Sequence, residues 1–333
     1  MTRPFGFLDS GSLASGRRPL QNRAATGKQR SMSLLSRLLP LQANGFGYGS
    51  TADDVVRDLD LSSRTILLTG CASGLGRETL AALARRGARV FAAARSEARA
   101  REACAGIAQA QPIVCDLASP GSVRACCETL RKGAPPLDAI ICNAGIMALP
   151  KLEQAYGYEL QFFTNHVGHF LLVTGLLERL APQGRVVMVS SNAHRRAPRE
   201  GIQFDNLSGE AGYNPFQNYG QSKLANLLFS NELARRLPEG QSSNALHPGV
   251  IATNLARSSP SFVQLMLKAA EPLALKSPAQ GAATQCYVAV HPGMQSTGRY
   301  FSHCNLAEPS ALGSDPALAR KLWETTERIV AGL

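Results

Sequence analysis

The sequence predicts an α/β protein built on a single doubly wound parallel sheet with helices on both faces. From residue 64 onward, short apolar runs alternate with segments of ten or more residues that carry helical patterns. The apolar runs are continuous, which is typical of strands that are buried on both faces of a parallel sheet. Right-handed crossovers between such strands produce a doubly wound sheet.

The alternation can be followed element by element. Strands are predicted at 64–70, 88–95, 111–117, 137–145, 184–191 and 241–249. Helices are predicted at 76–87, 97–108, 120–132, 165–180 and 219–237. The first helix spaces Leu80, Leu83 and Ala84 for one buried face. No second alternation follows, so we expect one domain over residues 45–333.

Composition is that of an ordinary globular enzyme, with 44% hydrophobic and 18% charged residues in a chain of 333. No apolar window approaches twenty residues, so no transmembrane segment is expected. The eight cysteines are scattered and form no C-x-x-C pair. This pattern predicts reduced, mostly buried thiols in a cytosol-like, cytoplasmic compartment.

The positive charge is concentrated at the N-terminus. Residues 1–50 carry seven Arg or Lys and one acidic residue, which accounts for +6 of the net charge of +11. A basic nucleic-acid-binding face on the folded domain is therefore not expected. Residues 1–44 show no sustained apolar period and are predicted to be a disordered basic leader. The open alternatives are an organelle transit peptide within residues 1–31 and a true start at Met32.

A glycine-rich loop joins the first predicted strand to the first helix. In "TGCASGLGRET", Gly70, Gly74 and Gly76 form a G-x3-G-x-G spacing. Such a loop lets the backbone approach a pyrophosphate and points free N–H groups from a helix N-terminus. Its position after the first strand predicts a Rossmann fold that binds a dinucleotide. The residues expected to contact the cofactor here are Gly70, Ser73, Gly74, Leu75 and Gly76.

The end of the second strand predicts which dinucleotide is bound. NAD-binding proteins usually place Asp or Glu there, where it accepts from the ribose 2′-hydroxyl. This chain has Arg95 instead, and a guanidinium suits a 2′-phosphate. NADP(H) is therefore favoured over NAD(H). A surface ion pair with Glu97 is the alternative role for Arg95.

Seven short motifs occur in order along the chain. They are "TGCASGLG", "DL" at 116–117, "NAG" at 143–145, "NHVGHF" at 165–170, "VSS" at 189–191, "YGQSK" at 219–223 and "HPG" at 247–249. Together they resemble the short-chain dehydrogenase/reductase family, and in particular its retinol-dehydrogenase-like branch. The resemblance covers about residues 45–330.

The resemblance implies four catalytic residues: Asn165, Ser191, Tyr219 and Lys223. Tyr219 would be the acid/base, and Lys223, one helical turn away, would lower the pKa of the phenol and bind the nicotinamide ribose. Ser191 would hydrogen-bond the substrate oxygen, with Ser190 as the alternative register. Asn165 would help to hold a water that links Lys223 to solvent.

The resemblance also implies further cofactor contacts. These come from Asp116, Leu117, Asn143, Ala144, Gly145, Pro248, Gly249 and Thr253. Asp116 would accept from the adenine amino group, and Thr253 would bind the nicotinamide carboxamide. His166 and His169 have a spacing that can hold a metal. No third ligand is evident, so packing roles are expected for them and no metal.

An apolar segment follows Thr253, where the family places its substrate lid, here around 254–275. It predicts a lipophilic alcohol or carbonyl substrate. Two alternatives stay open: a double-bond reductase like the protochlorophyllide reductases, and an NADP(H)-sensing binding module. The resemblance also admits a homodimer formed through the helix that bears Tyr219.

Overall fold

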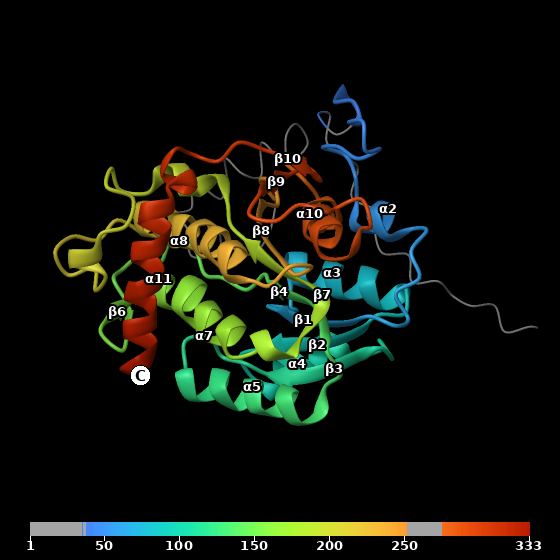
Figure 1. Ribbon diagram of the computed structural model, residues 1–333, viewed down its shortest axis with the longest axis horizontal. Helices are drawn as coiled ribbons and strands as arrows, with labels where there is room; N and C mark the ends of the chain where they lie inside the picture. The colour runs from blue at the N-terminus through green and yellow to red at the C-terminus, as the bar shows by residue number, and fades with distance from the viewer. Residues whose placement is uncertain (1–34, 36–37, 252–274) are drawn as a thin grey trace, which may run out of the picture. The chain divides into compact units, whose positions relative to one another are not determined.

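The computed structural model describes residues 35, 38–251 and 275–333, and its central element is an eight-stranded sheet (Figure 1). The strand order is β10-β9-β8-β7-β4-β1-β2-β3, and only β10 runs antiparallel to its neighbour. The strands are β1 (Thr65–Thr69), β2 (Arg89–Ala94), β3 (Ala110–Val114), β4 (Leu137–Cys142), β7 (Leu180–Val189), β8 (Ser242–His247), β9 (Tyr300–Ser302) and β10 (Asn305–Leu306). A separate hairpin consists of β5 (Gln154–Ala155) and β6 (Tyr158–Glu159). The predicted fold class is confirmed.

Helices cover both faces of the sheet (Figure 1). One face carries α2 (Ala52–Val56), α3 (Gly74–Arg85), α4 (Glu97–Cys104) and α10 (Pro278–Val290). The other carries α5 (Pro120–Gly133), α7 (Gly168–Thr174) and α8 (Pro215–Arg236), with α11 (Pro316–Ala331) packed against α8. Short helical turns are α6 (Leu160–Phe162), η1 (Phe163–Val167), η2 (Leu177–Arg179), η3 (Asn192–Arg196), η4 (Phe204–Asn206) and η6 (Leu312–Ser314).

Alternate residues of each central strand enter different cores. Leu67 and Ile140 pack with the α5–α7–α8 layer, whereas Ile66 and Ile141 pack with the α3–α10 layer. Because both faces are buried, every position of these strands favours an apolar residue, which explains the continuous apolar runs. Strand order reverses between β1 and β4, and ligands bind beyond the carboxyl ends of strands at such a point.

Element boundaries differ from the predictions in two places that affect the site. The helix predicted to start at Asn165 begins at Leu160, because the Glu159 carboxylate accepts hydrogen bonds from two backbone N–H groups of its first turn. It then passes through the π-helical turn η1 before becoming α-helical as α7. The helix predicted from Tyr219 begins at Pro215, where Asn214 is the N-cap.

Parts of the predicted leader and lid lie outside the described residues. These are residues 1–34 and 36–37, and residues 252–274, which include Thr253. Within the described end of the leader, Asn44 Nδ2 donates to the carbonyl of Cys304 at 2.8 Å.

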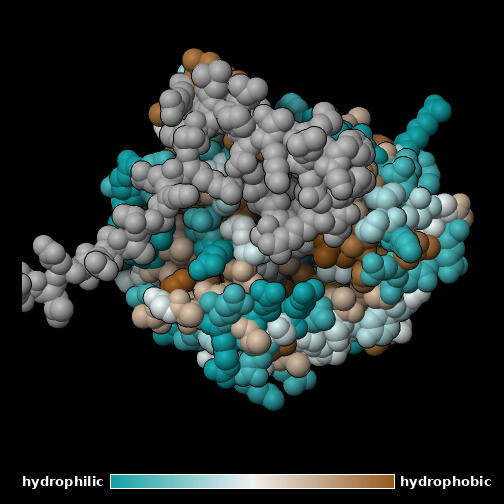
Figure 2. Space-filling view, turned by 180° about the vertical axis from the view of Figure 1, so that it is seen from behind, coloured by the Kyte–Doolittle hydropathy of each residue, from teal (hydrophilic) through white to brown (hydrophobic). Residues whose placement is uncertain are grey.

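The burial of the cysteines and the polarity of the described surface agree with what the composition predicts. Seven of the eight cysteines are buried, in agreement with the prediction of mostly buried thiols. On the side opposite to Figure 1, the described surface intersperses hydrophilic and hydrophobic residues (Figure 2). Among the described residues, no helix has the length and apolar composition needed to cross a membrane.

Candidate active site

The loop between β1 and α3 has the shape that a pyrophosphate requires. Gly70 and Gly74 have φ values of +72° and +53°, which favour glycine. A Cβ on Gly70 would lie 2.8 Å from Ala144 Cα, and a Cβ on Gly76 would overlap the Gly70 carbonyl. The N-cap residue Ser73 makes no side-chain capping bond, so it does not occupy the first N–H groups of α3. This cradle fits the dinucleotide that the spacing predicted.

Asn143, at the end of β4, supports this loop from below. Its Nδ2 donates to the carbonyls of Thr69 at 2.8 Å and Gly70 at 3.3 Å. The amide is therefore used within the protein, and its contribution to a cofactor site is to hold the loop in shape. Gly145 lies deeper in the site, since a Cβ there would be 3.1 Å from Asn165 Oδ1 and 3.4 Å from Lys223 Nζ.

The far end of the cofactor region contains Arg95 and Asp116. Arg95 is exposed directly after β2, while Glu97 forms its ion pair with Arg101 at 2.5 Å. Arg95 has no ion pair among the described residues, so the alternative pairing with Glu97 is not observed. Asp116 Oδ1 accepts from Ala118 N at 3.1 Å and shapes the turn after β3, next to the buried Leu117.

Tyr219 and Lys223 share one face of α8, and both are buried. Lys223 Nζ lies 5.7 Å from the centroid of the Tyr219 ring and donates to the carbonyl of Val189 at 2.9 Å. Val189 ends β7, and Ser191 follows two residues later, where its hydroxyl is close enough to the Tyr219 phenol to affect its pKa. The end of β7 therefore brings a hydroxyl and a carbonyl to the two α8 side chains.

Ser190 points in a different direction from Ser191. Its hydroxyl donates to the backbone carbonyl of Lys223 at 2.7 Å and so ties β7 to α8. Ser191 is half-buried, and its hydroxyl accepts from Ala193 N at 3.1 Å. Ser191 is thus the serine beside Tyr219, whereas Ser190 has a structural bond.

Burial shifts the pKa values of Tyr219 and Lys223 so that the neutral form of each side chain is favoured. It raises the pKa of Tyr219 to about 12, although the nearby Ser191 hydroxyl acts in the opposite direction. It lowers the pKa of Lys223 to about 8. The pKa of Tyr219 is therefore raised in the protein alone, in contrast to the expected lowering, because loss of solvation of the phenolate has the largest effect. At neutral pH the phenol therefore keeps its proton.

Asn165 lies in the π-helical turn η1 and is fully buried. Its Oδ1 accepts from Ile146 N at 2.8 Å, and its Nδ2 donates to Ile146 O and to Ser222 Oγ, both at 2.9 Å. Ser222 Oγ in turn donates to the backbone carbonyl of Tyr219 at 2.8 Å. The Ser222 hydroxyl thus links the Asn165 side chain to the backbone of Tyr219.

The turn after β8 contains Pro248 and Gly249, and it adjoins a residue that the sequence did not mark. Gly249 has a φ of +103°, and a Cβ there would be 2.6 Å from Cδ of Lys276. Lys276 is buried, and its Nζ has no hydrogen-bond partner among the residues that the structure describes. This Nζ lies 4.8 Å from the Tyr48 ring centroid. Nothing in the local pattern around Lys276 distinguishes it from an exposed lysine. Leu75 packs at the same end of the site, 2.5 Å from a Cβ built on Gly281.

The two histidines of "NHVGHF" are bonded within the protein. His166 Nε2 is 2.9 Å from Thr326 Oγ1, and His169 lies between Thr69 and Asn165. Burial lowers the pKa of His166 to about 3 and that of His169 to about 4. Within the described ranges, no three metal-ligating side chains come together.

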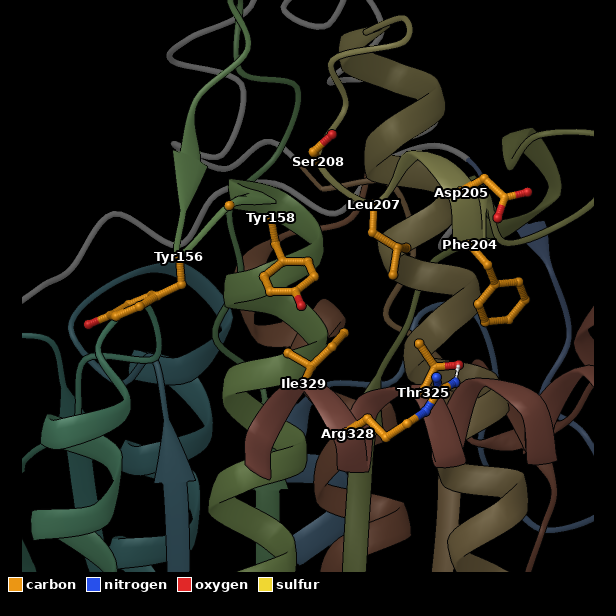
Figure 3. A pocket seen from close by; sticks show the side chains of 10 residues that line it. Tyr156, Tyr158, Phe204, Asp205, Leu207, Ser208, Thr325, Arg328 and Ile329 are labelled. Atoms are coloured by element: carbon orange, nitrogen blue, oxygen red, sulfur yellow. Dashed lines mark hydrogen bonds between the residues drawn. The ribbon is translucent and has the colours of Figure 1, made fainter. Parts of the chain in front are cut away.

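A surface groove has a volume of about 580 Å³ (Figure 3). It is lined by the β5–β6 hairpin with Tyr156 and Tyr158, by the η4 region, and by Arg328 and Ile329 of α11. None of the predicted site residues lines it. The groove is therefore not the candidate active site.

Comparison with known proteins agrees with this geometry. A family model described as short chain dehydrogenase matches residues 64–263. The chain is 41% identical over 307 residues to "Short-chain dehydrogenase TIC 32 B, chloroplastic" of Brassica napus, covering 87% of this chain and 96% of the relative. It is 40% identical over 297 residues to retinol dehydrogenase 14 of Homo sapiens, covering 81% and 87%.

Solved structures give the same result. An uncharacterized protein from Mycobacterium paratuberculosis matches with a TM-score of 0.69 and 33% identity, over 85% of this chain and 97% of that one. A short chain dehydrogenase from Burkholderia cenocepacia J2315, in complex with NADP, matches with a TM-score of 0.60 and 24% identity, over 73% and 96%. At that identity the second likeness speaks for the fold alone.

Proposed function

Because the chain belongs to the short-chain dehydrogenase/reductase family and is an NAD(P)-dependent oxidoreductase acting on CH–OH groups, we propose that it interconverts a lipophilic alcohol and its ketone or aldehyde with NADP(H). Tyr219 is the acid/base of this proposal. Within the family, the chain is similar to the retinol dehydrogenases.

The observation that carries the proposal is the buried group around Tyr219. A phenol, a serine hydroxyl and an ammonium come from two adjacent elements, the end of β7 and the helix α8. The Ser191 hydroxyl lies near enough to the Tyr219 phenol to act against the rise in its pKa, and Lys223 Nζ lies 5.7 Å from the centroid of the tyrosine ring. A carbonyl oxygen that lies between these two side chains would meet both hydroxyls at once.

In the direction of reduction, each residue has a separate task. A bound nicotinamide supplies the hydride to the carbonyl carbon. Tyr219 holds the proton that passes to the carbonyl oxygen, since its pKa of about 12 keeps the phenol protonated at neutral pH. Ser191 orients the same oxygen. The positive charge of Lys223 stabilises the phenolate that remains after the proton has left.

Arg95 supports the choice of NADP(H). It is exposed at the carboxyl end of β2 and has no ion pair among the described residues. A guanidinium in this position can bind a 2′-phosphate in a bidentate fashion, which an Asp or Glu would repel. The close-packed loop at Gly70 and Gly76 supports a dinucleotide whose pyrophosphate lies at this loop and whose 2′-phosphate lies at Arg95.

The proposed lipophilic substrate rests on relatives and on the apolar sequence after Thr253. Retinol dehydrogenase 14, at 40% identity, carries such a substrate in its name. The lid region itself lies outside the described residues. A hydrophobic pocket discriminates weakly between lipophilic compounds, so the class and not one compound is proposed.

A panel of aldehydes, ketones and alcohols tested with NADPH and NADH in parallel tests this function. We expect turnover of lipophilic carbonyls with NADPH favoured by about tenfold or more, a difference of about 1.4 kcal/mol. Arg95→Ser should reduce that preference. Arg99→Ser, an exposed arginine of α4 that pairs with Glu102 at 3.3 Å, is the matched control.

Two results would count against the proposal. A preference for NADH that does not respond to Arg95→Ser would overturn the cofactor assignment. Tight NADPH binding without turnover across the whole panel would overturn the enzymatic role and favour an NADP(H)-sensing module.

A further inference from the structure

A continuous chain of buried hydrogen bonds runs from the cofactor loop to the backbone of Tyr219, and His169 is its central member. Thr69 Oγ1 lies 2.9 Å from His169 Nε2, and His169 Nδ1 lies 2.9 Å from the carbonyl of Asn165. Asn165 Nδ2 and Ser222 Oγ then continue the chain to the carbonyl of Tyr219. Every side chain in it is buried.

The direction of the hydrogen bond between Thr69 and His169 follows from the partners of Thr69. Its hydroxyl oxygen accepts from the backbone N–H groups of Asn143 and Ala144, each at 3.0 Å. These two bonds use both lone pairs of the oxygen, so the hydroxyl can only donate in its other contacts. His169 Nε2 at 2.9 Å is a nearer acceptor than the carbonyl of Ile141 at 3.4 Å.

The hydrogen bond at His169 Nδ1 independently indicates that Thr69 donates to Nε2. The carbonyl of Asn165 can only accept, so His169 Nδ1 must carry the proton. A neutral imidazole with its proton on Nδ1 has a bare Nε2, which accepts from Thr69. Burial keeps the ring neutral, and the nearby charge of Lys223 acts in the same direction. The structure thus defines one tautomer.

Both ends of this series of hydrogen bonds belong to the proposed site. Thr69 ends β1, and its partners Asn143 and Ala144 adjoin the glycine loop. Asn165 sits in the π-helical turn η1, and its carbonyl faces His169 Nδ1 at 2.9 Å. His169 supplies the donor to this carbonyl from within the same helix.

We propose that His169 is a positioning residue that couples the cofactor loop to the Asn165–Tyr219 side of the reaction centre. Through Nε2 it fixes Thr69 and the ends of β1 and β4. Through Nδ1 it fixes the Asn165 backbone, and hence the hydrogen bonds to Ser222 and Tyr219. This inference rests on the proposed function, in which these two regions bind the cofactor and transfer the proton.

Nitrogen-15 NMR of the histidine rings in the wild-type chain tests the tautomer without any assay. We expect the sequence-assigned His169 to show a protonated Nδ1 and a bare Nε2 throughout pH 5.5 to 8. An Nε2–H tautomer, or a titration of the ring in this range, would overturn the inference.

Two substitutions separate the two hydrogen bonds. In His169→Asn the amide nitrogen takes the place of Nδ1, so the bond to Asn165 is kept and the bond to Thr69 is lost. In His169→Gln the amide reaches the place of Nε2, so the bond to Thr69 is kept and the bond to Asn165 is lost. We expect His169→Asn to weaken NADPH binding several-fold at nearly unchanged kcat. We expect His169→Gln to lower kcat roughly tenfold at nearly unchanged NADPH binding.

A purely structural role predicts no such split. Equal losses of NADPH affinity and kcat in both variants, in proportion to lost thermal stability, would overturn the inference. His166→Gln is the control, since this equally buried imidazole bonds to Thr326 of α11 and should change neither quantity. Absence of turnover in the wild-type chain would defeat the proposed function instead. In that case the tautomer and the NADPH affinities of the variants still decide the role of His169.

Discussion

Tyr219 and Lys223 show how strongly burial governs single side chains in this protein. A tyrosine and a lysine one turn apart suggest a cation that acidifies a phenol, yet burial of the phenol has the larger effect. The result is a protonated tyrosine next to an ammonium whose own pKa is lowered to about 8. A protonated phenol is the state that the proposed reduction of a carbonyl requires of Tyr219.

Lys276 is a second buried lysine, and within the described part of the chain its ammonium has no hydrogen-bond partner. Burial lowers its pKa to about 8 from 10.5. Between these values the unfolded chain binds more protons than the folded chain, so the free energy of unfolding should rise with pH. Lys276→Met should remove this gain, which we expect to be about 1–3 kcal/mol.

Urea unfolding at pH 8 and pH 10 measures this difference. The wild type should gain more stability between the two pH values than Lys276→Met does. Equal gains in both proteins would show that Lys276 is not a strained buried cation.

Gly76 is the position where the loop before α3 has no room for a side chain. A Cβ would overlap the Gly70 carbonyl, so Gly76→Ala should displace the cradle and weaken NADPH binding about tenfold or more. Gly121→Ala is the matched control, because nothing lies within 4 Å of a Cβ in the first turn of α5. It should leave NADPH affinity unchanged and raise stability by about 0.5–1 kcal/mol. Equal affinity in both variants, measured by titration calorimetry, would contradict the close approach of this backbone to the cofactor.

Among the elements, the buried strands were predictable and the irregular turns were not. Strands such as β1 and β4 require apolar residues at every position, so their sequences reveal them. The π-helical turn η1 depends on one extra residue in a helical turn, and its apolar pattern is that of a regular helix. The short strands β9 and β10 are defined by their pairing at the sheet edge, which no local pattern records.

The same contrast holds for the site. Tyr219, Lys223 and Ser191 could be found because their motifs have fixed spacing, and the structure brings them together. The burial of Lys276 and the hydrogen bonds of His169 could not be predicted, because both depend on which distant residues lie around them. Thr69 is 100 residues from His169 in sequence.

The helix α11 is anchored to the α7–α8 layer by the single tryptophan of the chain. The Trp323 ring stacks on Phe229 with centroids 5.6 Å apart, meets Phe170 edge-on at 4.9 Å, and lies 4.4 Å from the Arg236 guanidinium. Trp323→Ala should cost about 3–5 kcal/mol of stability through the cavity that it leaves.

Urea unfolding followed by far-UV circular dichroism measures this cost, with the exposed neighbour Glu324→Ala as control. A loss below about 1 kcal/mol would mean that α11 is held by other contacts.

At the scale of the whole molecule, α8 is enclosed within its own chain. Residues 218–230 of this helix are all buried, and α11 and η3 pack against it. The middle of the Tyr219-bearing helix is therefore not exposed for contact with a second copy of the chain. We therefore expect sedimentation of a 35.4 kDa monomer at micromolar concentration. A stable dimer at this concentration would contradict this expectation.

The most direct test of the central claim is the rate of NADPH oxidation by Tyr219→Phe with a lipophilic carbonyl that the wild type reduces. The substitution removes the phenolic hydroxyl and keeps the ring. Tyr158→Phe, on the β5–β6 hairpin away from the site, is the matched control. We expect Tyr219→Phe to lose at least about 100-fold in rate while its NADPH affinity stays within about twofold. Turnover near the wild-type rate in Tyr219→Phe would show that Tyr219 is not the proton donor.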